Sequence, residues 1–235
     1  AQVSSVIYNQ LREKGILETY EVEIGRLNND LHPAVPQNSL NKAQQKAFEE
    51  IKEGFARKNV TLLHGVTSAG KTEIYIHLIT EALERGEQVL YMLPEIALTK
   101  QIIERLQRVF GNRIGLYHSK FSDAERVEIW KKQLSDAPYD VILGVRSSVF
   151  LPFKDLGLVI IDEEHENSYK QQEPAPRYNA RNAAIVLASF FRAKTLLGTA
   201  TPSIESYYNA TTGKYALVNL TTRHKEVKMP EIEVI

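Results

Sequence analysis

The sequence predicts an α/β protein in which helices cover both faces of a mainly parallel β-sheet. Short, continuously apolar segments of strand length alternate with segments whose apolar residues recur at helical spacing. Strands that are apolar along their whole length are typical of a parallel sheet buried on both sides. Polar residues follow these segments at their carboxyl ends, where sheets of this kind bind ligands. The same pattern therefore predicts both the fold class and the edge of the sheet that carries the site.

The expected elements follow one another closely along the chain. A helix begins near Leu40, with Asn41 as its N-cap, and runs to about Phe55. Ser122 and Glu125 form a capping box, and Trp130 on that helix is assigned to the core together with Ile129 and Leu134. Strands are expected at residues 60–64, 88–93, 114–118, 139–143, 158–161, 195–197 and 216–218, and further helices at 73–79, 97–109, 122–134, 179–191 and 204–210.

Composition excludes several classes of protein. The chain has 235 residues, of which 43% are apolar and 25% charged, as in ordinary globular proteins. It has no cysteine, which rules out a disulfide scaffold and a thiolate zinc site within this sequence. No apolar run approaches the length that crosses a bilayer, and the sequence indicates no membrane partner. The formal net charge is zero, so nucleic-acid binding would require a local basic face.

Four segments are expected. Residues 1–27 combine a short amphipathic helix with an alternating strand and are interpreted as a fragment of a winged-helix-like domain. Residues 28–38 are polar with two prolines and form a linker. Residues 39–225 form the main domain, and 226–235 begin a following segment that is cut off. The chain is therefore interpreted as a piece of a longer protein.

A phosphate-binding loop, here called the P-loop, is the strongest single motif. The spacing G-x-x-x-x-G-K-[ST] falls between a predicted strand and a predicted helix, where backbone amides and the helix dipole favour phosphate. Lys71 is expected to reach the β- and γ-phosphates of ATP, and the Thr72 hydroxyl to bind Mg²⁺. The expected nucleotide-binding residues are Gly65, Val66, Thr67, Ser68, Ala69, Gly70, Lys71 and Thr72.

An acidic box follows the apolar strand at 158–161. Asp162 at the strand end is placed to bind Mg²⁺ beside Thr72, and Glu163 to orient and deprotonate the attacking water. An acidic cluster at a strand end is often only a solvated loop, but here a P-loop lies upstream in the same predicted sheet. The expected catalytic residues are Lys71, Asp162, Glu163 and His165.

The acidic box resembles the D-E-x-H box of helicase superfamily 2, and Thr199-Ala200-Thr201 resembles the Ser/Thr-Ala-Thr motif that the His contacts there. Three further stretches resemble the bacterial replication-restart helicases, the primosomal protein N′ family. These are Leu93 to Thr99, Gly144 to Phe150, and Ser168-Tyr169-Lys170-Gln171-Gln172-Glu173 with Arg177 to Arg181 after it. The resemblance covers about residues 38–225 and implies the first RecA-like lobe of such a helicase.

The resemblance also implies roles for particular residues. Gln44 would read adenine, as in a Q-motif, although a Gln at a helix start is more often just solvated. An aromatic-rich loop over residues 169–178 would sense single-stranded DNA, although this loop has a proline where the family often has an aromatic residue. A packed surface loop and a salt-bridged arginine remain the alternatives. The residues implied to contact DNA are Arg146, Ser147, Ser148, Lys170, Arg177, Tyr178 and Thr201.

By the same resemblance the activity is ATP-dependent 3′→5′ DNA unwinding in replication restart at stalled forks. The implied cofactors are ATP and Mg²⁺, with the family's zinc sites beyond the end of this chain. The implied partners are forked or single-stranded DNA, a second helicase lobe in cis, the primosome and single-strand-binding proteins, in the bacterial cytoplasm at the nucleoid. Arginines of the second lobe would also lie beyond the end, so this piece alone is expected to hydrolyse ATP poorly.

Two other function classes stay open at this point. A stand-alone P-loop enzyme such as a small-molecule kinase needs no Thr-Ala-Thr loop and no coupling to DNA. A non-catalytic clamp would be expected to show a damaged P-loop or acidic box, and neither is damaged in this sequence.

Overall fold

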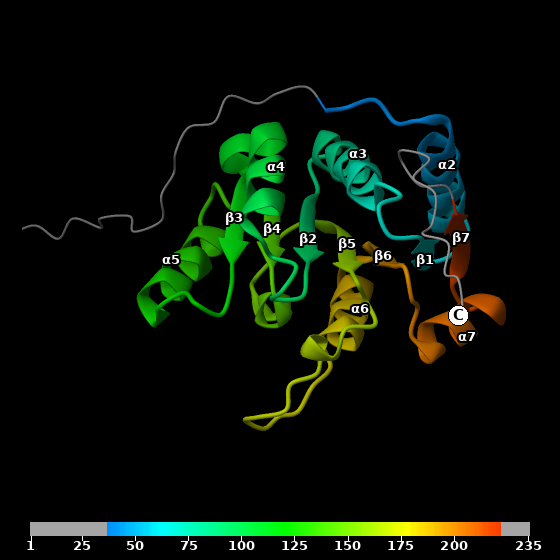
Figure 1. Cartoon of the computed structure of the whole chain (residues 1–235). Coiled ribbons are helices and arrows are strands. Elements are labelled where there is room, and N and C mark those ends of the chain that lie inside the picture. Colours follow the sequence, from blue (N-terminus) through cyan, green and yellow to red (C-terminus); the bar gives the residue numbers. More distant parts are fainter. Residues whose placement is uncertain (1–36, 222–235) are drawn as a thin grey trace, which may run out of the picture.

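The computed structural model describes residues 37–221 and contains one seven-stranded sheet (Figure 1). Every strand pairs with its neighbours in parallel, in the order β3-β4-β2-β5-β6-β1-β7. The predicted parallel sheet is therefore confirmed. The strands are β1 (Val60–Gly65), β2 (Gln88–Met92), β3 (Ile114–Tyr117), β4 (Val141–Gly144), β5 (Leu156–Asp162), β6 (Lys194–Thr199) and β7 (Ala216–Leu220).

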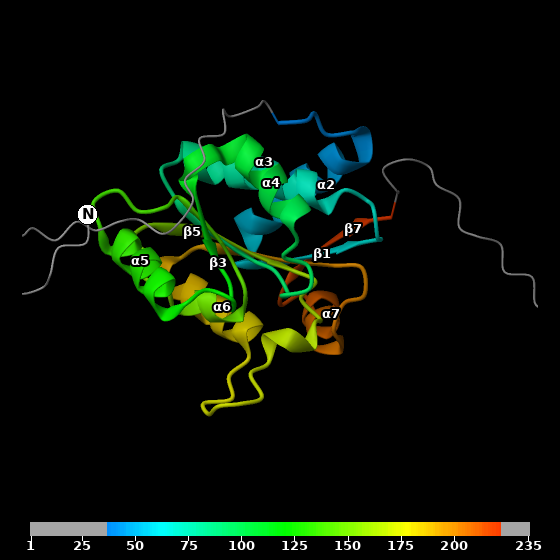
Figure 2. The ribbon, with the colours of Figure 1, turned by 60° about the vertical axis from the view of Figure 1, so that its left-hand side comes forward.

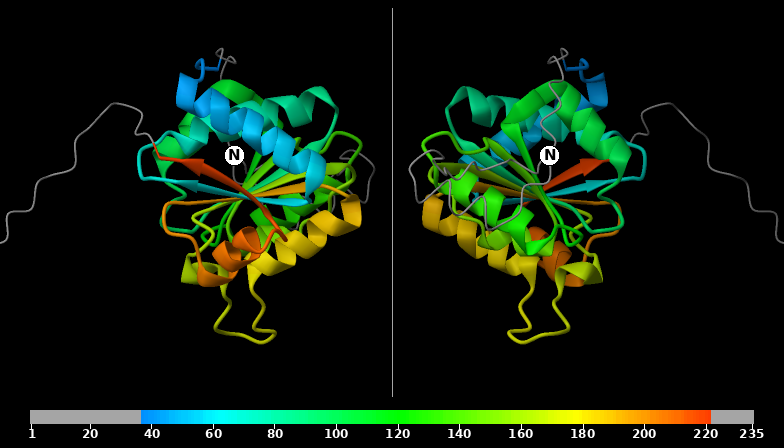
Figure 3. Two further views of the ribbon diagram at one scale, coloured as in Figure 1. Left: turned by 90° about the vertical axis from the view of Figure 1, so that its right-hand side faces the viewer. Right: turned by 90° about the vertical axis from the view of Figure 1, so that its left-hand side faces the viewer.

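Helices cover both faces of the sheet, as Figures 2 and 3 show. One face carries α2 (Lys42–Arg57), α3 (Lys71–Glu84) and α4 (Lys100–Phe110). The other carries α5 (Asp123–Leu134), α6 (Ala180–Phe191) and α7 (Ile204–Thr211). Short 3₁₀ helices, η1 (Gly111–Arg113), η2 (Arg146–Phe150) and η3 (Asn167–Tyr169), lie in the connections.

The strands build two hydrophobic cores because successive side chains point to opposite faces. Leu63 and Tyr91 pack under α2, α3 and α4, whereas Leu62 and Leu90, each one residue earlier, pack against the opposite helices. Both cores consist of buried, mainly aliphatic side chains. The continuous apolar runs in the sequence are therefore explained by burial on both sides.

Local signals set most helix starts correctly. Asn41 with Gln44 and Ser122 with Glu125 form complete capping boxes at the starts of α2 and α5. Helix α4 begins at Lys100 rather than Ala97, because the preceding residues turn on the carbonyl of Pro94, which accepts from the amides of Ala97 and Leu98.

The assignment of Trp130 and Leu134 to the core is wrong. Ile129 is fully buried, but Trp130 is 44% exposed and Leu134 is 58% exposed. The buried face of α5 is formed by Ile129 and Gln133, which are four residues apart. Trp130 lies about 100° further round the helix and so faces away from the sheet.

The predicted winged-helix fragment at 1–27, most of the linker at 28–38 and the segment at 226–235 lie outside the described residues. Of the main domain at 39–225, residues 222–225 also lie outside them. Within residues 37–221, no helix is long and apolar enough to cross a membrane.

Candidate functional site

The P-loop joins β1 to α3 at the carboxyl edge of the sheet. Gly70, the N-cap of α3, has a φ of 79°, a left-handed conformation that glycine adopts without steric cost. A Cβ on Gly65 would lie 3.2 Å from the side chain of Lys71, so the first glycine leaves room for the lysine to fold over the loop. The first turn of α3 therefore presents amide groups without helical partners beside a cationic side chain.

Lys71 lies between the P-loop and the acidic box. Its Nζ donates to the carbonyl of Gly65 at 3.0 Å and lies 3.6 Å from the Oε1 of Glu163. The lysine thus already spans the space in which a γ-phosphate would have to lie between these two motifs. Lys71 follows β1 and Glu163 follows β5, two strands far apart in the sequence, and the fold brings the two side chains together.

Gln44 lies beneath the P-loop and is fully buried. Its amide nitrogen donates to the carbonyl of Ala69 at 3.2 Å, and its Oε1 accepts from the backbone amide of Asn41 at 2.9 Å. Both ends of the amide are therefore bonded to protein. In this conformation Gln44 supports the loop and presents no group to adenine, so an adenine contact requires the amide to turn outward.

Three buried tyrosines surround Asp162 at the end of β5. Tyr75 on α3 donates its hydroxyl to Asp162 Oδ1 at 3.0 Å, and Tyr91 on β2 donates to Oδ2 at 3.4 Å. Tyr169 donates to the backbone carbonyl of Asp162 at 2.7 Å. The amide of Glu163 adds a further donor to Oδ1 at 3.1 Å. Burial raises the pKa of each tyrosine well above its ordinary value, so the hydroxyls remain donors.

Sequence reasoning missed Tyr75 and Tyr91 because apolar periodicity assigns both rings simply to the core. One signal was present: Tyr75 lies four residues after Lys71, and residues at this spacing share a helix face. A hydroxyl on the face of α3 that carries the P-loop lysine was therefore a candidate for contact with the acidic box.

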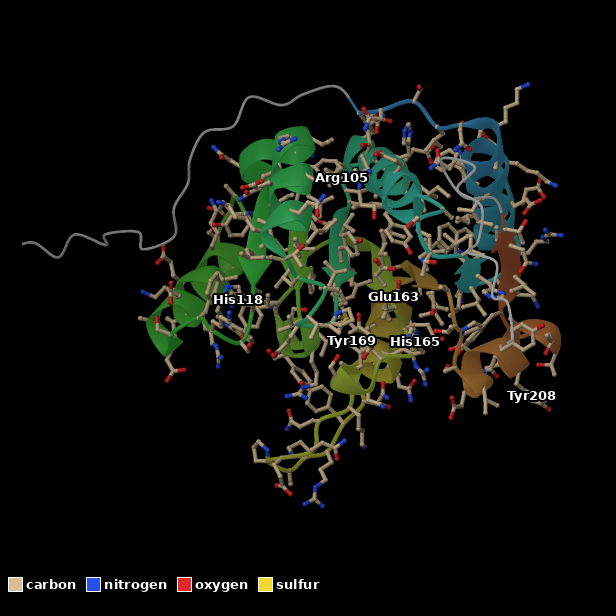
Figure 4. All side chains as sticks on the ribbon, in the orientation of Figure 1. Arg105, His118, Glu163, His165, Tyr169 and Tyr208 are labelled. Atoms are coloured by element: carbon tan, nitrogen blue, oxygen red, sulfur yellow. The ribbon has the colours of Figure 1, made fainter. Side chains whose placement is uncertain are left out.

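Glu163 stands at the turn that leaves β5. It has a φ of 45°, in the left-handed region, and its carboxylate lies between Lys71 and the His165 ring, with Oε2 3.8 Å from Nδ1. Figure 4 shows Glu163, His165 and Tyr169 gathered beneath the carboxyl end of β5. A carboxylate so placed beside the P-loop lysine can accept a proton from a water molecule that attacks a bound phosphate.

His165 connects the acidic box to the loop after β6. Its Nδ1 lies 2.8 Å from Thr199 Oγ1, and its Nε2 lies 3.3 Å from Thr201 Oγ1. The contact between the acidic box and the Thr-Ala-Thr segment that the sequence predicted is present. Thr201 is itself exposed at the surface, so its hydroxyl is accessible to a ligand beyond His165.

Glu164, the third residue of the acidic box, points into the protein and its side chain is 0% exposed. Its carboxylate accepts from Arg181 at 2.7 Å, from the amide of Ser203 at 2.7 Å and from the Ser206 hydroxyl at 2.8 Å. This network joins the box to the start of α6 and to α7. No sequence signal separates Glu164 from Glu163, which precedes it, is the same residue type and remains partly exposed.

Residues 171–178 form a projecting loop, here called the arm, which Figures 1 and 2 show extending away from the sheet. An antiparallel bridge between Lys170 and Asn179 closes its base. Arg177 pairs with Glu173, and Tyr178 packs edge-on against Phe150 with ring centroids 4.8 Å apart. The arm therefore carries one exposed cation, Arg177, and its one described aromatic contact is at its base.

The predicted DNA-contacting residues of η2 differ in their exposure. Arg146 donates to the carbonyls of Ser168 and Lys170, both at 3.4 Å, and Ser147 is partly exposed. Ser148 is fully buried and its hydroxyl donates to the Val145 carbonyl at 2.6 Å, so in this conformation it presents no group to DNA. Its role is to close the turn that follows β4.

A comparison with protein-family models decides the family. The model described as DEAD/DEAH box helicase matches residues 41–210, which contain the P-loop, the acidic box and the Thr-Ala-Thr segment. The chain belongs to the DEAD/DEAH box helicase family. A stand-alone kinase-like P-loop enzyme is therefore not favoured.

Curated relatives of this helicase chain share one printed name, Replication restart protein PriA. The chain is 48% identical over 196 residues to the protein of Rickettsia felis, covering 83% of this chain and 30% of that protein. It is 39% identical over 237 residues to that of Bacillus subtilis, covering 99% and 29%, and 41% identical over 229 residues to that of Haemophilus influenzae, covering 94% and 31%. The chain thus spans about a third of the length of the relatives it matches.

Solved helicase structures share the fold at low sequence identity. A hypothetical ATP-dependent RNA helicase from Sulfolobus tokodaii matches with a TM-score of 0.54 and 19% identity, covering 77% of this chain and 53% of that one. The DUF1998 helicase MrfA bound to DNA also gives a TM-score of 0.54, with 17% identity, covering 78% and 26%. These likenesses confirm the RecA-like helicase fold.

The helicase chain offers oxygen ligands that suit Mg²⁺. Burial, together with the neighbouring carboxylate of Glu163, raises the pKa of Asp162 to about 6. A divalent cation beside these two carboxylates would relieve the charge that causes this rise. Within residues 37–221, no three His, Asp or Glu side chains cluster as a metal site by themselves. The residues therefore fit a Mg²⁺ that shares its ligands between Asp162, Thr72 and a nucleotide's phosphates.

Proposed function

We propose that this chain is the ATP-binding motor lobe of an ATP-dependent 3′→5′ DNA helicase that acts in replication restart at stalled forks. The observation that carries the proposal is one connected path of side chains. It runs from Lys71 to Glu163, on to His165, and from there to Thr199 on the next strand. The printed name of the relatives supports the assignment to replication restart.

The proposed chemistry assigns one task to each side chain on this path. Lys71 leaves the Gly65 carbonyl and contacts the β- and γ-phosphates, while the amides of the P-loop surround them. Thr72 and Asp162 hold Mg²⁺, which when bound neutralises the phosphate charge. Glu163 orients a water molecule in line with the γ-phosphate and accepts its proton. The present 3.6 Å contact between Lys71 and Glu163 separates when nucleotide binds, because both groups turn toward the ligand.

His165 would transmit the state of the nucleotide. When Glu163 turns toward a bound γ-phosphate, the ring of His165, now 3.8 Å from its carboxylate, loses this charged neighbour. The ring also contacts Thr199 and Thr201, so its movement would shift the exposed loop after β6. We propose that Thr201 contacts DNA from this loop.

The remaining DNA contacts are proposed for the arm and for η2. Three cationic side chains lie at this end of the sheet, those of Arg146, Lys170 and Arg177. Tyr178 adds an aromatic ring and Ser147 a hydroxyl. Arg146 and Lys170 now donate to backbone carbonyls of the arm and its base, so they would exchange these bonds for phosphate oxygens. Stacking on Tyr178 would require the ring to leave Phe150.

The wider setting is also a proposal. Because the relatives are about three times as long, we infer that a second helicase lobe follows in cis and supplies the catalytic arginines. Primosome components and single-strand-binding proteins are the proposed protein partners, in the cytoplasm of a bacterium at its nucleoid.

The test of the nucleotide site uses the full-length protein with Lys71→Ala. We expect ATP hydrolysis, with and without forked DNA, to fall to background, and nucleotide binding to weaken. Lys58→Ala, just beyond the end of α2, is the matched control for loss of a lysine and should leave both activities unchanged. Unchanged hydrolysis in the Lys71 variant would refute the site assignment.

The test of the DNA contact uses the salt dependence of single-stranded DNA binding. Arg177→Ala removes one phosphate contact and should lower the slope of log K against log salt by about 0.7. Arg57→Ala, which removes another exposed, glutamate-paired arginine at the end of α2, is the control. A slope that stays the same for both variants would exclude a phosphate contact at Arg177.

A further inference from the structure

Tyr75 is a core residue whose hydroxyl is also hydrogen-bonded to the carboxylate of Asp162. Tyr75 is fully buried and lies one helical turn after Lys71 on α3. Its hydroxyl donates to Asp162 Oδ1 at 3.0 Å, and its ring packs edge-on against Tyr91 with centroids 5.6 Å apart. One helix therefore carries both the P-loop lysine and a hydroxyl bonded to the proposed metal ligand.

The neighbouring strand leaves space for this hydroxyl. A Cβ on Gly198 of β6 would lie 1.8 Å from the Tyr75 hydroxyl and 3.3 Å from Asp162 Oδ1. Any side chain at position 198 would push the hydroxyl off the carboxylate. The glycine, the tyrosine and the aspartate thus form one arrangement built from three separate elements, β6, α3 and β5.

The donors fix the orientation of the carboxylate but leave it able to bind a cation. Oδ1 accepts hydrogen bonds from the Tyr75 hydroxyl and from the amide of Glu163. These two bonds use both lone pairs of Oδ1. Among residues 37–221, Oδ2 accepts only the longer bond from Tyr91, at 3.4 Å. Oδ2 therefore keeps a lone pair free in a defined direction, as a metal ligand or a ligand of metal-bound water requires.

We propose that Tyr75, supported by Tyr91, is a positioning residue that fixes the carboxylate of Asp162 for binding Mg²⁺ with a nucleotide. The inference rests on the proposed function, because it assumes that Asp162 and Thr72 share Mg²⁺ with bound phosphates. Hydrogen bonds to a metal-ligating group orient it, and their loss typically lowers metal affinity by about 10–100-fold. The phosphate contacts of the P-loop do not pass through Tyr75 and should be unaffected by its hydroxyl.

The experiment measures binding of a fluorescent ADP analogue to the full chain, first in EDTA and then at fixed ADP with increasing Mg²⁺. Tyr75→Phe and the double variant with Tyr91→Phe keep the buried rings and remove only the hydroxyls. Tyr139→Phe is the matched control, since Tyr139 is also buried but precedes β4 at the opposite edge of the sheet. Thermal unfolding of each variant checks that the fold is retained.

We expect Tyr75→Phe to raise the Mg²⁺ concentration at half-effect by about tenfold, and the double variant by more, with ADP binding in EDTA unchanged. Tyr139→Phe should behave as wild type. If wild type responds to Mg²⁺ and the double variant needs the same Mg²⁺ concentration, the inference about Tyr75 is overturned and the proposed metal site is not. Equal losses in EDTA and in Mg²⁺ would also overturn it, since they indicate a structural role. A wild type that binds ADP without any response to Mg²⁺ would overturn the proposed metal site and this inference together.

Discussion

Replacing Arg181 with Met should lower the free energy of unfolding by about 3 kcal/mol. The change removes the only cation that contacts the carboxylate of Glu164 among residues 37–221, and that side chain is 0% exposed. Breaking a buried pair on one side costs about 3–5 kcal/mol, because an uncompensated charge remains inside the protein. Three donors from Ser203 and Ser206 still reach the carboxylate, which places the expected loss at the lower end of this range.

Urea unfolding followed by far-UV circular dichroism measures this loss, and thermal unfolding should show a midpoint about 6–12 °C lower. Arg57→Met is the matched control. Arg57 pairs with Glu53 on the surface of α2, with both side chains more than two-thirds exposed, and its loss should leave the midpoint unchanged. Adding Glu164→Gln to Arg181→Met should recover part of the stability, since a neutral amide replaces the unpaired charge.

Two results would refute this reasoning. A loss below about 1 kcal/mol in Arg181→Met would mean that the carboxylate of Glu164 is not held as a buried ion. A double variant no more stable than Arg181→Met would mean that the loss arises from packing of the arginine stem and not from charge.

Three further predictions concern the acidic box and its neighbours. The raised pKa of Asp162 means that, without Mg²⁺, the folded chain takes up a proton between about pH 6 and 4 and loses stability as the pH rises through this window. At pH 8, the free energy of unfolding of Asp162→Asn, measured with urea, should therefore exceed that of wild type by up to about 3 kcal/mol, and this difference should disappear by pH 4. Equal free energies of unfolding at pH 8 would contradict the raised pKa of Asp162. Gly198→Ala should lower the free energy of unfolding, measured by thermal unfolding, by about 1–3 kcal/mol, and by clearly less when Tyr75 is already replaced by Phe. If the losses of the two single variants simply add in the double variant, a clash with the Tyr75 hydroxyl is excluded. His165→Ala in the full-length protein should reduce the stimulation of ATP hydrolysis by DNA more than it reduces nucleotide binding, and an equal reduction of both would argue against transmission through Thr199.

The strands, the P-loop turn and the edge of the sheet that carries the site could be predicted from the sequence, because each depends on a local pattern. Apolar runs between helical segments identify strands buried on both faces, and Gly70 with Lys71 identifies the turn from β1 into α3. The parallel arrangement then requires Asp162 and Lys71 to meet at one edge, although 91 residues separate them in sequence. Their meeting follows from topology and needs no knowledge of side-chain packing.

What could not be predicted depends on which way individual side chains turn. Ser148 follows a strand end like the exposed candidates, but a bond to the Val145 carbonyl turns its hydroxyl inward. Glu164 has the same chemistry as Glu163, but Arg181, Ser203 and Ser206 supply the donors that hold its carboxylate inside the protein. Tyr75 gives the same periodic signal as an aliphatic core residue. In each case the deciding partner lies on another element, so no local pattern encodes it.

The place of β7 in the sheet has a consequence for the order in which the chain is made. Strand β7 pairs along β1, and the carbonyl of Leu220 accepts a hydrogen bond at 3.1 Å from the amide of Val66, the first residue after Gly65. A ribosome would therefore have to add about 150 residues beyond the P-loop before the strand that braces it exists. Until then β1 would have one open edge, so a nascent chain should become able to retain nucleotide only after β7 has left the exit tunnel.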